Sequence, residues 1–324
     1  MRRTPIHKAL VFGAGALFAS ACDQSFNPYD NRSDVPIVYS FLATDRSIQY
    51  LRIYKSIDQS TETTPPDGGE LPITAAQVMI SDGVSTYTFK DTLLERTDTT
   101  RYRSPIHVYL CPSFIPLRGT TYNLTVDAAP YMQVFGSVTV PWRSFPGFSS
   151  TKFLDDPGLY PDDEKIVVSA GMEAQPSAAI LRLLVEYEVF ENSAFVTFWD
   201  EVPIVFLTKE PNLEEALYGS VKKLETNVII GVYSNLAYRT LMSGIASKTY
   251  PKPLRYRKII IQVVQLEENL YNYYSVVRGF EDPFSIRLDK PNYSNIMNGS
   301  GLFGAYTVDT VSHTLPTNFV GNRP

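Results

Sequence analysis

The densest cluster of side chains that could do chemistry is acidic and lies near the middle of the chain. Calcium takes about six to eight oxygen ligands, so these carboxylates are weak candidates for a metal site. Their spacing does not match an EF-hand, and a flexible run does not hold two glycosidase acids at a fixed separation. We therefore expect a solvated loop between domains and no metal. The cluster consists of Asp155, Asp156, Asp162, Asp163 and Glu164.

Histidine-dependent catalysis is poorly supported by the sequence. The chain has three histidines, His7, His107 and His313. The first lies in a segment that we expect to be removed, and the other two lie about 200 residues apart, in different predicted domains. Zinc-protease, serine-hydrolase and phosphate-loop motifs are absent from the sequence. The sequence therefore predicts a protein that is not an enzyme and has no cofactor.

Cys22 ends an N-terminal segment with the layout of a secretory signal peptide. Arg2, Arg3 and Lys8 precede an uncharged run from Ala9 to Ala21, and "ASAC" follows the pattern of small residues at a cleavage site. The run is shorter than the roughly 20 apolar residues of a membrane-spanning helix. "ASAC" resembles the lipobox of bacterial lipoproteins, which implies that Cys22 becomes the first mature residue and carries lipid such as palmitate. An ordinary secreted protein cut near this position is the alternative.

Composition excludes some partners and favours a β-rich fold. Without Arg2, Arg3 and Lys8, 26 basic residues face 34 acidic ones, a net charge of −8. That balance argues against nucleic acid, which calls for a basic stripe. The 21 tyrosines and 18 phenylalanines suit half-buried strands. Cys111, in "VYLCPSF", is expected to be a buried structural thiol.

The chain length and its turn clusters predict two domains that follow an N-terminal tether. We expect a signal peptide over 1–21, a tether over 22–34, an immunoglobulin-like β-sandwich over 35–141, a linker over 142–164, and a second β-rich (α+β) domain over 165–324. Asp82-Gly83 predicts a two-residue hairpin. The strands expected in the sandwich are Ile37–Leu42, Tyr50–Lys55, Gln77–Ser81, Ser85–Phe89, Tyr102–Arg103, His107–Cys111, Thr121–Val126 and Val134–Val140.

The second region has longer apolar runs and one or two short helices. Ile180–Phe190 and Ile259–Leu266 are typical of central strands. Glu267–Arg278 and Tyr233–Ser247 are the expected helices, the second with Asn235 as a candidate cap. Tyrosines in the first helix, Tyr271, Tyr273 and Tyr274, offer rings for sugar stacking, but packing of helix on sheet is the favoured interpretation.

A glycine-rich stretch near the C-terminus gives the most specific signal. In "NYSNIMNGSGLFGAY" (292–306), Asn298-Gly299 and Gly301 predict a tight turn with positive φ, followed by a strand through Leu302–Val308. With "PITAAQVMISDG" (72–83), "RGTTYNLTV" (118–126), "GSVTVP" (136–141), "NLYNYYSVV" (269–277) and "DPFS" (282–285), this stretch resembles Bacteroidetes outer-membrane lipoproteins that carry a domain of unknown function and are often encoded beside TonB-dependent receptors.

The resemblance implies a lipid-anchored protein of the outer membrane, on its surface or periplasmic face. It also implies a role beside a TonB-dependent transporter, and it carries over no catalytic residue. The sequence-based hypothesis is a non-enzymatic binding or accessory subunit that meets the membrane through its anchor. The alternative is a stand-alone surface lipoprotein that binds a glycan or a peptide.

Overall fold

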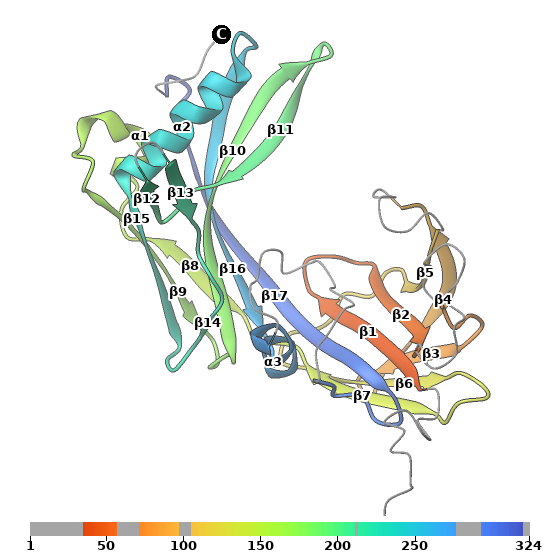
Figure 1. The fold of residues 1–324 in the computed structure, drawn as a ribbon. Coiled ribbons are helices and arrows are strands. Elements are labelled where there is room, and N and C mark those ends of the chain that lie inside the picture. The colour runs from red at the N-terminus through yellow and green to blue at the C-terminus, as the bar shows by residue number, and fades with distance from the viewer. Residues whose placement is uncertain (1–34, 57–70, 97–104, 211–212, 277–292, 320–324) are drawn as a thin grey trace, which may run out of the picture. The chain divides into compact units, whose positions relative to one another are not determined.

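A computed structural model describes residues 35–56, 71–96, 105–210, 213–276 and 293–319 (Figure 1). The predicted tether, the predicted signal peptide with Cys22 and the candidate strand Tyr102–Arg103 lie outside these ranges. The mainly β fold with short helices is confirmed. None of the helices in the described part of the chain has the length and apolar character that a membrane-spanning helix needs.

The N-terminal strands form two layers that enclose one core. Strand pairing runs β1-β2-β5-β4-β3-β6-β7. Val38 of β1, Ile80 of β3 and Leu124 of β6 belong to one shared hydrophobic cluster. In Thr121–Asp127 the even-numbered side chains are buried and the odd-numbered ones face outward, as the sequence pattern predicts. The strands are β1 (Pro36–Ala43), β2 (Gln49–Lys55), β3 (Gln77–Ser81), β4 (Thr86–Leu94), β5 (Ile106–Cys111), β6 (Thr121–Asp127) and β7 (Val134–Thr139).

The β3–β4 hairpin is confirmed, but its turn is longer than predicted. Ser81 pairs with Thr86, so residues 82–85 form the connection in place of the two-residue Asp82-Gly83 turn. The Asp82 carboxylate accepts hydrogen bonds from the backbone N–H groups of Val84 (2.9 Å) and Ser85 (2.6 Å). These bonds lower the pKa of Asp82, and a backbone hydrogen bond from the Asp82 N–H to the Ser85 carbonyl (3.3 Å) closes the same turn.

The second half of the chain is built around two long central strands. β10 and β16 pair along their length, β11 and β17 flank them, and β15, β9 and β8 form a separate three-stranded sheet. The remaining elements are β8 (Ser144–Phe148), α1 (Lys152–Asp155), η1 (Pro157–Leu159), β9 (Lys165–Met172), β10 (Ala178–Glu191), β11 (Ala194–Glu201), β12 (Val205–Glu210), β13 (Leu213–Leu217), β14 (Lys222–Lys223), β15 (Val228–Ser234), α2 (Asn235–Thr249), β16 (Leu254–Leu266), α3 (Glu268–Val276) and β17 (Ser300–Thr314).

The last strand connects the two halves of the chain. The first part of β17 pairs in parallel with β1, in a register that sets Val38 opposite Gly301. The second part pairs antiparallel with β16, from Tyr306 opposite Leu266 to Thr314 opposite Lys258. Figure 1 shows β17 in blue running along both neighbours. β17 therefore joins the predicted sandwich to the predicted second domain in one sheet, and the domain boundaries themselves stay a prediction.

The segment over 142–164, predicted as a linker, is ordered by contacts with both halves. β8 pairs with β9, and Leu154 is fully buried in the core of the second half. Asn235 is also fully buried, and its amide nitrogen donates to the carbonyl oxygens of Pro157 (3.0 Å) and Pro161 (3.0 Å). The predicted role of Asn235 as a helix cap is wrong: the Ser234 hydroxyl caps α2 by accepting from the backbone N–H of Ala237.

Candidate functional site

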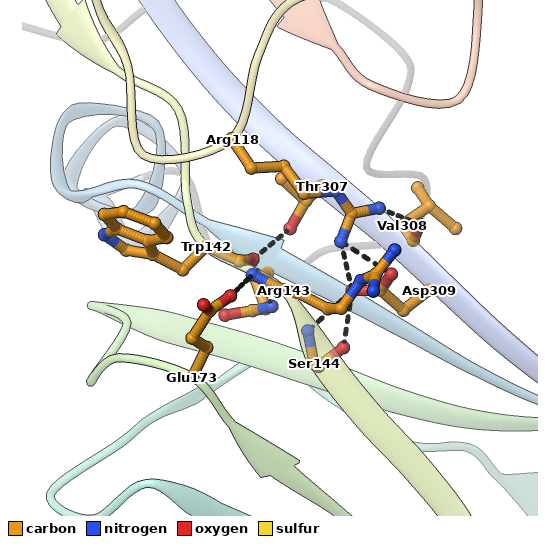
Figure 2. Close-up of polar contacts among 9 residues, drawn as sticks. Arg118, Trp142, Arg143, Ser144, Glu173, Thr307, Val308 and Asp309 are labelled. Carbon is orange, nitrogen blue, oxygen red and sulfur yellow. Dashed lines mark hydrogen bonds and ion pairs between the residues drawn. The ribbon is translucent and has the colours of Figure 1, made fainter.

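A partly buried ion pair holds together three segments that are far apart in the sequence. Arg118 donates through Nη1 to both carboxylate oxygens of Asp309, at 2.6 and 2.8 Å, and through Nη2 to the carbonyl of Val308 at 3.3 Å. Ser144 donates to the same carboxylate from its backbone N–H (2.7 Å) and its hydroxyl (2.8 Å). Figure 2 shows the loop before β6, the start of β8 and β17 meeting at Asp309.

This network positions Trp142, which lies between β7 and β8. The Trp142 carbonyl accepts hydrogen bonds from the Gln265 side chain (2.9 Å) and from the Thr307 hydroxyl (3.4 Å). Its ring packs on Gly119, where φ is +70° and an added Cβ would lie only 2.4 Å from the ring. Only glycine fits there, because both the backbone angle and the close approach exclude a side chain. The Trp142 ring is thus fixed, yet 45% of the residue is exposed.

Trp142 borders a cleft of about 410 Å³. This volume falls within the range of about 300–1,000 Å³ that is typical of small-molecule sites. The walls come from the end of β7, the connection to β8, the loop between β9 and β10, the end of β16 and the start of α3. The lining residues are Ser137, Val138, Thr139, Val140, Pro141, Trp142, Ala174, Gln175, Pro176, Ser177, Leu266, Glu267, Glu268 and Asn269. We call this the Trp142 cleft.

Glu267 is a buried carboxylate at the edge of the Trp142 cleft. Its oxygens accept hydrogen bonds from the backbone N–H groups of Asn269 and Leu270, both at 2.7 Å, so the side chain caps α3. Burial outweighs these bonds and raises the pKa of Glu267 to about 7. Near neutral pH this residue therefore exists in both protonation states.

Replacing Glu267 with glutamine is expected to remove a pH dependence of stability. The folded state has the higher pKa, so this carboxyl favours folding below its unfolded pKa of 4.5, and that contribution is lost as pH rises through about 7. At about 1.4 kcal/mol per pH unit, ionisation costs the fold about 3 kcal/mol. Urea unfolding of wild type and variant at both pH values measures this effect. From about pH 4 to about pH 8, the unfolding free energy of Glu267→Gln relative to that of wild type should rise by about 3 kcal/mol.

The exposed neighbour Glu268 gives a matched control. Glu268→Gln removes the same charge one residue away and should leave the pH profile close to that of wild type. Parallel pH profiles for wild type and Glu267→Gln would contradict the assignment of the titration to Glu267.

The acidic cluster predicted from the sequence does not form a metal-binding group in the structure. Asp155 contacts the ring Nε2 of His313 at 2.6 Å, and Asp162 forms an ion pair with Arg239 at 2.6 Å. Asp156, Asp163 and Glu164 lie on the same connection, and within the described ranges no three His, Cys, Asp or Glu side chains are placed to hold a metal ion. The cluster instead fixes the loop to α2 and β17.

Cys111 and the tyrosines of α3 were interpreted from the sequence as packing residues. Cys111 is a buried free thiol whose pKa is raised by burial, which confirms the structural interpretation. Tyr273 and Tyr274 are 1% and 5% exposed and pack in the core beneath α3, and Tyr271 is half-buried. Packing of helix on sheet is confirmed for these rings, and they do not form a stacking surface.

Sequence reasoning missed the residues that shape the Trp142 cleft. Trp142 lies at the start of the predicted linker, in "PWR", where a composition rich in proline, glycine and serine predicts a loop. The available signal was the rarity of tryptophan: the chain has two, and both Trp142 (45%) and Trp199 (56%) are exposed. Trp199 lies on β11 and donates from its ring nitrogen to Glu186 at 3.2 Å.

Comparisons with known proteins identify the family but no activity. No curated protein matches the chain. Among solved structures, the C-terminal globular domain of an oligosaccharyltransferase from Pyrococcus abyssi is similar at 16% identity over 70% of this chain and 42% of that chain, with a TM-score of 0.22, which is too low to support an argument. Residues 24–312 match one family, and the chain belongs to it: the family described as a domain of unknown function (DUF4249).

Proposed function

We propose that this protein is a lipid-anchored component of the cell envelope that acts as a non-enzymatic binding or accessory subunit of a TonB-dependent transporter. The observation that carries the proposal is the position of Cys22. It directly follows the uncharged run from Ala9 to Ala21, and three basic residues precede that run. Two or three acyl chains on that residue anchor a protein almost permanently, because each buried methylene contributes about 0.8 kcal/mol.

The described body is compatible with attachment through such an anchor. Its first strand, β1, begins at Pro36, and residues 23–35 separate it from Cys22. A chain extends at most about 3.5 Å per residue, so this length allows the body to stand some 40 Å from the bilayer. The proposed outer-membrane location and the transporter partner rest on the resemblance of "SNIMNGSGLFGAY" and the other motifs to envelope lipoproteins.

The chain offers a matched pair of cysteine variants to test the anchor. Cys22→Ala is expected to abolish incorporation of a palmitate analogue during growth and to move the protein from the detergent phase to the aqueous phase. Cys111→Ala should keep both the label and the detergent partition, because that thiol is buried in the core. Labelling that survives in Cys22→Ala would contradict the proposal, as would an unlabelled wild-type protein.

Affinity purification from envelope membranes tests the partner separately. Wild-type protein is expected to copurify with a TonB-dependent receptor, whereas recovery of the protein alone favours the second candidate function. That candidate is a stand-alone lipoprotein that binds a glycan or a peptide, and the specific observation in its favour is the Trp142 cleft.

A further inference from the structure

We propose that the Trp142 cleft is a binding site for a neutral saccharide. The inference deepens the glycan-binding candidate function, since it names the site and the class of sugar. It rests on three independent properties of the cleft: a fixed aromatic ring, neutral hydrogen-bonding groups and a negative charge.

The aromatic ring is preorganised. The Trp142 ring is held by Gly119, and its carbonyl is held by Gln265 and Thr307. An exposed tryptophan with a fixed ring offers a large flat surface at low cost in conformational entropy. The apolar face of a pyranose ring is complementary to such a surface. A tryptophan without a ligand would gain more free energy from burial in the core.

The polar groups of the cleft suit hydroxyl groups. Gln175 and Ser177 contribute from the loop before β10, and Ser137 contributes from β7. The hydroxyls of Ser137 and Ser177 make no hydrogen bond within the described part of the chain, so each can still donate and accept. The Gln175 side chain donates to the carbonyl of Leu224 at 3.2 Å, which orients its amide. Several small neutral donors and acceptors around one aromatic ring match a ligand with many hydroxyls.

The charge of the cleft selects against anions. Its described lining includes the exposed carboxylate of Glu268 and the buried, partly ionised Glu267, and no lysine, arginine or histidine. Phosphorylated ligands and acidic sugars would meet like charge without a counter-ion. We therefore assign a neutral sugar rather than a nucleotide, a sugar phosphate or a uronic acid.

Tryptophan fluorescence gives a direct assay in the full-length protein in detergent. Trp199→Phe leaves Trp142 as the sole tryptophan, because the chain has only two. Maltose, cellobiose, lactose, xylobiose and di-N-acetylchitobiose are the probes, titrated to about 10 mM so that weak millimolar binding is visible. At least one is expected to change the fluorescence of Trp199→Phe in a saturable manner. Digalacturonate is expected to bind at least about tenfold more weakly than the best neutral disaccharide. Glu268→Gln should reduce this difference in affinity.

Calorimetry with matched variants locates the binding. Trp142→Ala is expected to weaken the best probe about tenfold or more, as loss of one aromatic contact predicts, while Trp199→Ala leaves the affinity unchanged. Gln175→Ala, on the exposed loop, provides a second variant in case Trp142→Ala unfolds, and it should also weaken binding. Urea midpoints of all variants separate loss of binding from loss of fold.

Three results would overturn the proposal. The first is the absence of saturable binding by any probe, and the second is binding that Trp199→Ala abolishes but Trp142→Ala preserves. The third is a response to choline without a response to any saccharide, which would make the cleft a cation site. Palmitate labelling of the same variants reports on the anchor alone, so failure of the sugar site is distinguishable from failure of the envelope role.

Discussion

Gly301→Ala is expected to lower the free energy of unfolding by at least about 3 kcal/mol, among the largest effects of any single methyl group in this chain. Gly301 has φ +116°, and an added Cβ would lie 2.0 Å from the carbonyl oxygen of Val38. That oxygen belongs to β1, directly across the parallel pairing with β17. Because neither backbone can move without breaking the register, the strain cannot relax through a side-chain rotamer.

Urea unfolding of the variant measures this effect, and a second glycine provides the control. Gly244 lies inside α2 with nothing within 4 Å of an added Cβ. Gly244→Ala should therefore raise stability by about 0.5–1 kcal/mol, since alanine is the better helix former. A Gly301→Ala protein as stable as wild type would show that β1 and β17 do not pair as described.

Asp309→Ala is expected to lower the free energy of unfolding by about 3 kcal/mol. The carboxylate accepts from Arg118 and from both donors of Ser144, and the side chains of Arg118 and Asp309 are only 27% and 12% exposed. Its removal leaves a partly buried guanidinium and two further donors without their acceptor. The cost arises mainly from these unpaired groups, so the double variant Arg118→Ala/Asp309→Ala should recover part of the lost stability.

A double-mutant cycle followed by urea unfolding measures the coupling. The exposed pair of Lys252 and Glu191, with 53% and 33% side-chain exposure, is the control. Its disruption should cost under about 1 kcal/mol, as is usual for surface ion pairs. Additive effects of the Arg118 and Asp309 substitutions would contradict the prediction, because they would mean that the two side chains do not depend on one another.

Local periodicity was sufficient to predict most of the strands. The alternation in Thr121–Asp127 reflects burial of one face of the strand, and the apolar run in Ala178–Glu191 reflects a central strand. Both patterns can be recognised from residues that are adjacent in the sequence. β11 was missed because its hairpin turn carries no glycine. Asn192 and Ser193 adopt positive φ values of 49° and 69° instead, a conformation that the residue types signal only weakly.

The site could not be predicted because its parts meet only in the folded chain. Arg118 and Asp309 are 191 residues apart, and Ser144 lies 165 residues from Asp309. No local pattern marks such a contact, and the composition around Trp142 favours a loop. His313 and Asp155, which lie 158 residues apart, were likewise assigned to separate features. The acidic run was visible in the sequence, but its partners were not.

The double pairing of β17 also constrains how the polypeptide is made. Arg46, just after β1, bonds through its guanidinium to Tyr306, 260 residues further on. At about 5–20 residues per second, a ribosome needs on the order of ten seconds or more between synthesising these two positions. During that interval the edge of β1 lacks its neighbour, so β1 cannot complete its pairing until Ser300–Thr314 of β17 have been made.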